Sequence, residues 1–147
     1  MESVGERCFY YRDIEPFLEQ DSNEIHEKIY ASARPPPTSE QSNAWKEQIR
    51  ILKDQLKDYD DAKMIFEYTI PRVGKRVDNV IILKNIVFIL EFKCVLTKKE
   101  RAEGGYPKSA IDQVYDYALD LKFFHKESAD KLIVPILVCT KSADFNN

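Results

Sequence analysis

Residues 76–93 carry two apolar runs rich in β-branched side chains, and these runs flank Lys84-Asn85. β-Branched residues suit the pleated, buried surface of a sheet. A two-residue loop suits a tight hairpin turn, and Asn tolerates the positive φ that such a turn needs. The pattern therefore predicts two antiparallel strands joined at Lys84-Asn85, with Leu83 opposite Ile86.

Two other segments carry apolar residues at helical spacing and are predicted as amphipathic helices. The first begins at Ser39 or Ser42, either of which can act as its N-cap, and runs to about Tyr59. The second begins at Ser109 and runs to about His125. Their predicted buried faces are Trp45, Ile49, Leu52 and Leu56 in the first helix, and Ile111, Val114, Ala118 and Leu121 in the second.

Two more strands complete the predicted sheet. Residues 64–70 are predicted as a strand with Phe66, Tyr68 and Ile70 on one face, and residues 132–140 form a continuous apolar run typical of a strand buried on both faces. Pro135 lies in that run and lacks an N–H, which favours an edge position or a bulge. We expect a single compact unit overall, with a helical extension and a Pro-rich connector at 1–38 and a domain at 39–147.

The N-terminal extension carries two helix-start signals. Asp13 can cap a short turn that contains Pro16, since proline is tolerated in a first turn. Asp21 and Ser22 can cap a second helix, which carries Ile25 and Ile29. We expect both pieces to pack over the core of the domain.

The hairpin register brings two acidic side chains together. With Leu83 facing Ile86, Asp78 falls opposite Glu91, and opposed residues share a face with Cβ atoms roughly 5 Å apart. Two such carboxylates repel each other, and a divalent cation between them would remove that repulsion, because hard oxygen ligands suit Mg²⁺. Lys93 lies two residues beyond Glu91 and is expected on the same face.

Asp78 followed by Glu91-Phe92-Lys93 resembles the signature of the PD-(D/E)XK phosphodiesterase superfamily, the restriction-endonuclease-like nucleases, although Val77 replaces the proline of that name. The resemblance implies an α/β fold with an α-β-β-β-α-β core and a mixed central sheet flanked by helices. It implies that Asp78, Glu91 and the Phe92 carbonyl bind Mg²⁺ or Mn²⁺. It also implies that Lys93 orients or deprotonates the attacking water, or offsets phosphate charge.

A second motif lies in the later helix. Gln113 and Tyr117 are neighbours at i and i+4 and form a Q-x-x-x-Y pattern, which resembles the fourth motif of RecB-type nucleases. The resemblance extends to the nuclease-like N-terminal domain of some bacterial Schlafen-type helicase proteins. It implies DNA as the partner, a fused or associated helicase, and polar groups of this helix facing the substrate. The alternative for Tyr115 and Tyr117, which we accept for Tyr115, is core packing with a hydrogen-bonded hydroxyl.

Further acids are candidates for an accessory role. Many relatives place an additional metal-binding acid on the first helix, where Glu47 is the nearest acid, but its helical phase favours a surface charge. Gln41 or Gln48 could reach the edge of the site through a hydrogen bond instead. Glu67 either serves the site as an acid or forms an ion pair with Arg72 or Arg76.

Basic residues that could hold a phosphate backbone precede Asp78 and follow Lys93. The alternative in both places is a solvated cluster of charges. The candidates are Arg72, Lys75, Arg76, Lys98, Lys99 and Arg101.

Composition limits the classes of function. A net charge of −3 over 147 residues gives no overall attraction to nucleic acid, so any such contact must use a local basic patch. Three cysteines without metal-ligand spacing predict reduced thiols in a cytoplasmic protein. No apolar run reaches the length of a membrane span, and the N-terminus lacks a signal-peptide pattern.

Three functions fit these observations. The first is a metal-dependent nuclease acting on DNA. The second is a nuclease-like fold used as a nucleic-acid-binding or regulatory module without catalysis. The third is a structural domain in which Asp78, Glu91 and Lys93 only form salt bridges.

Overall fold

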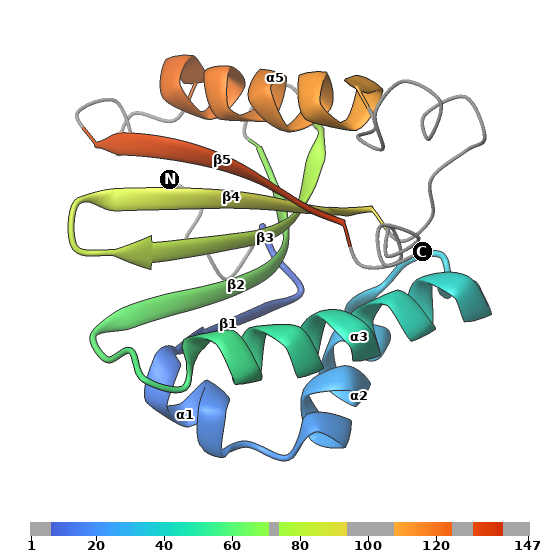
Figure 1. Ribbon diagram of the computed structural model, residues 1–147. Coiled ribbons are helices and arrows are strands. Elements are labelled where there is room, and N and C mark those ends of the chain that lie inside the picture. Colours follow the sequence, from blue (N-terminus) through green and yellow to red (C-terminus); the bar gives the residue numbers. More distant parts are fainter. Residues whose placement is uncertain (1–6, 71–73, 94–107, 125–130, 140–147) are drawn as a thin grey trace, which may run out of the picture.

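The computed structural model describes residues 7–70, 74–93, 108–124 and 131–139. It shows a mixed α/β fold with a five-stranded sheet flanked by helices (Figure 1). In chain order the elements are β1 (Tyr10–Asp13), α1 (Ile14–Glu19), α2 (Ser22–Ser32), α3 (Ser39–Leu56), β2 (Ala62–Thr69), β3 (Arg76–Leu83), β4 (Ile86–Lys93), α5 (Lys108–Phe124) and β5 (Leu132–Cys139).

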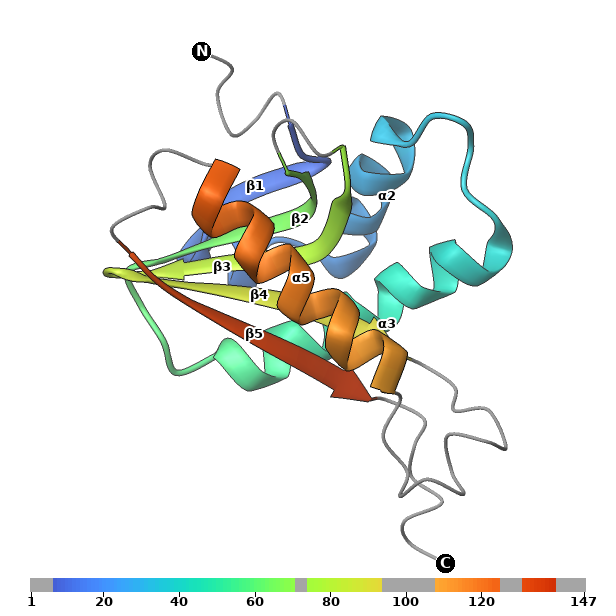
Figure 2. The ribbon, with the colours of Figure 1, turned by 90° about the horizontal axis from the view of Figure 1, so that it is seen from above.

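The strands follow the sheet in sequence order, β1-β2-β3-β4-β5. Strands β1 to β4 pair antiparallel, whereas β5 pairs parallel with β4. A parallel pair needs a long crossover connection, which contains α5. Helix α5 covers one face of the sheet, and α1, α2 and α3 lie on the other face (Figures 1 and 2).

Helix α3 forms the core of its face with the side chains that the periodicity predicts. Trp45, Ile49 and Leu52 are buried, and Leu56 is half-buried. Fully burying an aliphatic side chain of this size stabilises a fold by about 1.5–3 kcal/mol, so this face anchors α3 on the sheet. Its buried partners in the sheet include Met64, Phe66, Ile81 and Leu90.

On the opposite face, α5 buries Val114, Ala118 and Leu121 as predicted. Two predictions for α5 are wrong, because Ile111 is 41% exposed and Tyr115 is 57% exposed. Ile111 has the helical phase of the buried stripe, but it lies in the first turn of α5. Tyr115 falls on the side of α5 that faces solvent.

The hairpin register agrees with the prediction, since Leu83 pairs with Ile86. The positive φ of the turn, however, lies at Lys84, with a value of 56°, and not at Asn85 as expected. Lys84 thus carries the backbone strain that glycine would avoid.

The N-terminal segment contributes more than the two helices expected there. Strand β1 pairs with β2 as the first strand of the sheet, and it buries Tyr10 while Tyr11 remains 37% exposed. Asp21 caps α2 as predicted and accepts the N–H of Asn23 at 2.8 Å. A four-residue edge strand has too few alternating positions to be recognised from sequence.

The bounds of the later elements differ from the prediction by a few residues. Thr38, not Ser39 or Ser42, caps α3 and accepts a backbone N–H at 3.1 Å. The helix ends at Leu56, before Tyr59.

Strand β5 is at the edge of the sheet, as Pro135 indicated, but its side chains are mostly half-buried and not buried on both faces. Within the described ranges, an apolar groove of about 570 Å³ remains between α3 and strands β3 to β5. Leu56, Phe92 and Ile136 are among its lining residues.

Candidate active site

Asp78 and Glu91 lie at the end of the β3–β4 hairpin that is remote from its turn. The last backbone pair of the ladder is Asn79 with Leu90. Beyond that pair, the N–H of Asp78 donates to Glu91 Oε1 at 2.9 Å, and the N–H of Phe92 donates to Asp78 Oδ2 at 2.8 Å. Each carboxylate therefore binds the backbone of the opposite strand, and the two acids meet across the hairpin as the register predicts.

Glu67 of β2 lies next to Asp78 in the direction across the strands. The residues on either side of it pair with the residues on either side of Asp78, so Glu67 stands opposite Asp78. Its φ is 54°, in the left-handed region, which costs a residue other than glycine about 1–2 kcal/mol. Glu67, Asp78 and Glu91, from three neighbouring strands, are called the acid row below. Strained residues of this kind concentrate at functional sites.

Burial raises the pKa of all three carboxyl groups. Desolvation and the charge of Asp78 raise the pKa of Glu67 to about 7, against the opposite effect of Trp45 and Arg76. Desolvation is also the main cause of the raised pKa of Asp78 and of Glu91, and the charges of Asp78 and Glu67 raise that of Glu91 further. The acid row therefore resists carrying three negative charges, and a nearby cation would reduce that cost.

Trp45 of α3 fixes the orientation of Glu67. Its Nε1 donates to Glu67 Oε1 at 2.9 Å, and both side chains are buried. The sequence identified Trp45 only as an apolar core residue. A buried indole N–H usually finds a hydrogen-bond partner, but periodicity alone does not tell which acid provides it.

Glu67 also forms the ion pair that was one of its two predicted roles. Arg76 Nη1 lies 3.9 Å from Glu67 Oε2, and the Arg76 guanidinium lies over the ring of Phe9, 4.7 Å from its centroid. The second role, an acid of the site, stays a prediction.

Lys93 is the last residue of β4, pairs with Cys139 of β5, and is half-buried. Phe92 gives its N–H to Asp78 and packs its ring against the α3 face of the core. The proposed roles of the Lys93 amine and the Phe92 carbonyl depend on a bound metal and stay predictions.

The polar residues of the first helix take different positions. Glu47 pairs with Arg50 on the outer side of α3, with Oε1 2.6 Å from Nη2, in agreement with the surface-charge interpretation. Gln41 is exposed, whereas Gln48 is buried. Gln48 Oε1 and both polar side-chain atoms of Asn79 have no hydrogen-bond partner in the described part of the chain. Buried amides need a partner or ordered water, and Asn79 is a polar residue beside Asp78 that sequence reasoning missed.

Gln113 and Tyr117 contact each other on α5, where Gln113 Nε2 donates to the Tyr117 hydroxyl at 2.5 Å. Lys75 lies over the Tyr117 ring at 6.0 Å, and its Nζ is 3.5 Å from Asp120 Oδ2. Gln113 and Tyr117 line a shallow hollow of about 420 Å³ together with Lys75, Asp112 and Asp116. The contact of their side chains with substrate stays a prediction.

The predicted basic residues divide into two groups. Lys75 pairs with Asp120 of α5, and Arg76 pairs with Glu67 of the acid row. The others lie outside the residues that the structure describes, namely Arg72, Lys98, Lys99 and Arg101.

Asp78 and Glu91 are the residues best placed to hold a metal ion. Over the described segments, no three His, Cys, Asp or Glu side chains form a group that could hold one. Mg²⁺ is usually bound through one or two carboxylates and keeps several waters. The donor set therefore fits Mg²⁺ or Mn²⁺ better than zinc, whose structural sites use four protein ligands.

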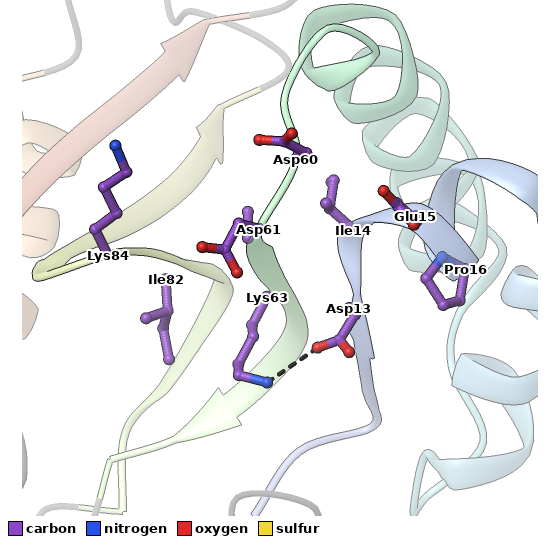
Figure 3. A pocket seen from close by; sticks show the side chains of 10 residues that line it. Asp13, Ile14, Glu15, Pro16, Asp60, Asp61, Lys63, Ile82 and Lys84 are labelled. Atoms are coloured by element: carbon purple, nitrogen blue, oxygen red, sulfur yellow. Dashed lines mark hydrogen bonds and ion pairs between the residues drawn. The ribbon is translucent and has the colours of Figure 1, made fainter.

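A separate hollow of about 680 Å³ lies near the turn end of the hairpin (Figure 3). Its acidic side chains are exposed, and Lys63 Nζ lies 3.0 Å from Asp13 Oδ1. Exposed pairs of this kind contribute little to stability, and we assign no function to them. The charged lining residues are Asp13, Glu15, Asp60, Asp61, Lys63 and Lys84.

No protein family, curated protein or solved structure matches the chain. No helix in the described segments has both the length and the apolar character that a membrane span requires.

Proposed function

We propose that the protein is a metal-dependent nuclease that hydrolyses phosphodiester bonds of DNA. The observation that carries the proposal is the reciprocal hydrogen bonding of Asp78 and Glu91 across the hairpin, with Lys93 two residues further along β4. Both half-buried carboxyl groups have raised pKa values, so ionising them side by side costs free energy. Groups of this kind concentrate at functional sites.

The order of elements supports the same proposal. Helix α3, the meander β2-β3-β4, helix α5 and the parallel strand β5 have the α-β-β-β-α-β order that the PD-(D/E)XK resemblance implies. The proposed fold is therefore restriction-endonuclease-like, with β1, α1 and α2 as an N-terminal addition.

Phosphodiester hydrolysis requires a positioned water and compensation for negative charge. Asp78 and Glu91 would hold the metal ion through their carboxylates. The ion, when bound, would lower the pKa of a coordinated water and offset charge on the phosphate. The Lys93 amine would orient the water or receive its proton.

The proposal is tested by incubating the purified chain with end-labelled single- and double-stranded DNA and RNA in Mg²⁺, Mn²⁺ or EDTA. We expect cleavage of DNA with a divalent metal and none in EDTA. Asp78→Asn should abolish cleavage, whereas Asp54→Asn, an exposed acid on α3, should cleave like the wild type. Cleavage by Asp78→Asn at the wild-type rate contradicts the proposal.

One observation favours the second function, a nuclease-like binding or regulatory module. Helix α3 turns Trp45 and Gln48 toward the core, and Glu47 is engaged with Arg50 on the outer side. None of these residues of α3 therefore adds a carboxylate to the acid row. A wild-type chain that binds DNA in Mg²⁺ but leaves it intact would support this function instead.

A further inference from the structure

Four side chains, one of them Glu67 of the acid row, form a closed cycle of contacts. The Trp45 indole donates to Glu67, and Glu67 pairs with Arg76 at 3.9 Å. The Arg76 guanidinium lies over the Phe9 ring at 4.7 Å, and the Phe9 ring meets the Trp45 ring edge-on, with centroids 6.3 Å apart. We call these four residues the Arg76 cycle.

A backbone hydrogen bond and burial hold members of the Arg76 cycle in place. The N–H of Phe9 donates to the Phe66 carbonyl at 3.0 Å, which attaches Phe9 to β2 immediately before Glu67. Trp45 is 1% exposed and Glu67 is 5% exposed. Only Arg76 reaches well into solvent, with 42% of its side chain exposed. The buried members therefore hold one cation at the surface, at the margin of the acid row.

Arg76 differs in this respect from its neighbour Lys75. The Lys75 amine is directed to α5, where Asp120 and the Tyr117 ring engage it. Arg76 lies two residues before Asp78 on β3. Its Nη1 is 3.9 Å from Oε2 of the buried Glu67, which is a long distance for an ion pair. A guanidinium has five N–H donors in a planar fork, so one weak pairing leaves donors for a second anion.

We propose that Arg76 binds a phosphate group of the nucleic-acid substrate, and that Phe9, Trp45 and Glu67 are the residues that position its guanidinium. This inference rests on the proposed function, because it takes the substrate to be a phosphodiester chain. Arg forms bidentate hydrogen bonds with phosphate oxygens, and an aromatic ring against its flat face restricts the guanidinium without using its donors. Arg76 would also offset part of the negative charge that the acid row presents to the backbone.

The inference is tested by binding and not by cleavage. Fluorescence anisotropy with a labelled DNA duplex is measured in EDTA over a range of salt concentrations. Each neutralised phosphate contributes about 0.9 to the slope of log affinity against log salt for duplex DNA. Arg76→Ala should weaken binding about tenfold and reduce that slope by about 1.

Arg50→Ala is the matched control, because Arg50 is 66% exposed on the outer side of α3 and pairs with Glu47. We expect it to leave affinity and slope near the wild-type values. Equal effects of Arg76→Ala and Arg50→Ala would overturn the inference, and so would a wild-type chain that does not bind DNA.

The positioning role has its own test. Arg76→Lys keeps the charge but loses the planar fork, so the salt slope should be retained while affinity falls about fivefold. Trp45→Phe keeps an aromatic ring beside Phe9 but removes the N–H to Glu67, and it should also weaken binding severalfold at an unchanged slope. Wild-type affinity in both variants would contradict positioning by the cycle. Thermal unfolding of each variant separates loss of binding from loss of the fold.

The outcomes separate this inference from the proposed function. Metal-free binding that depends on Arg76, without any cleavage in Mg²⁺, would support the phosphate contact and contradict the nuclease. Cleavage that depends on Asp78 but proceeds in Arg76→Ala with unchanged KM would support the nuclease and contradict the phosphate contact.

Discussion

Asp78 and Glu91 are joined through the backbone of each other's strand, because Glu91 accepts the N–H of Asp78 at 2.9 Å and Asp78 accepts the N–H of Phe92 at 2.8 Å. These bonds replace the backbone ladder, which ends at Asn79 and Leu90. Two acidic side chains are thus held together at a fixed place in the sheet. The stability of the metal-free protein should depend on how their charges are balanced.

Stability without metal should fall as pH rises. The pKa of Glu67 is about 7 in the folded protein, above its ordinary value of 4.5, so the folded state holds the proton more tightly than the unfolded state. This contribution is fully present below about pH 4.5, is lost as pH rises toward 7, and then levels off; the shift corresponds to about 3 kcal/mol. Urea unfolding in EDTA at pH 5 and pH 8 measures the difference.

Glu67→Gln should remove the part of that pH dependence that Glu67 contributes, because glutamine still accepts the Trp45 N–H but carries no proton to lose. The raised pKa values of Asp78 and Glu91 leave the remaining part in place. Glu47→Gln is the control, since Glu47 lies in an ion pair on the outer side of α3. Equal pH dependence in wild type and Glu67→Gln would show that Glu67 titrates normally.

Trp45 should report on the acid row by fluorescence. It is the single tryptophan of the chain, and its indole donates to Glu67 at 2.9 Å. Ionisation of Glu67 places a negative charge next to the indole, so emission should change with an apparent pKa near 7. The change should be absent in Glu67→Gln, and its persistence there would assign it to another group.

Lys93→Ala should reduce metal-dependent cleavage by about 10²–10⁴-fold, the usual contribution of a group that moves a proton in the reaction. Affinity for Mn²⁺ should change little, because the ammonium is not a ligand in this account. Lys57→Ala removes an exposed lysine next to Asp54 and serves as control. Cleavage by Lys93→Ala within twofold of the control would exclude Lys93 from the reaction.

Lys84→Gly should stabilise the protein by up to about 1 kcal/mol, because Lys84 has a φ of 56° and glycine adopts that conformation without the side-chain penalty. Asn85→Gly is the matched control in the same turn. It should not stabilise the fold, since the positive φ lies at the preceding residue. The midpoint of thermal unfolding distinguishes the two, and a gain for Asn85→Gly alone would contradict the turn geometry.

The hairpin and the main helices could be predicted because each depends on local patterns. The β-branched runs predicted the two strands, and the two-residue loop predicted the register of Leu83 with Ile86, which places Asp78 opposite Glu91. Helical spacing likewise identified Trp45, Ile49 and Leu52 as buried.

The features that could not be predicted depend on contacts between segments that are distant in the sequence. The left-handed backbone of Glu67, its hydrogen bond with Trp45 and the stacking of Arg76 on Phe9 join four separate parts of the chain. No spacing rule links these residues. The exposure of Ile111 was missed for a similar reason, because helical phase does not reveal which turns of α5 are covered.

The most direct test of the central claim is a calorimetric titration of the metal-free protein with Mn²⁺ at pH 7.5, with wild type, Glu91→Gln and Asp54→Asn compared. We predict saturable binding by wild type and Asp54→Asn, and loss of that binding in Glu91→Gln, because one carboxylate alone holds a hydrated dication weakly. Saturable binding of equal affinity in Glu91→Gln and wild type would contradict a metal site formed by Asp78 and Glu91.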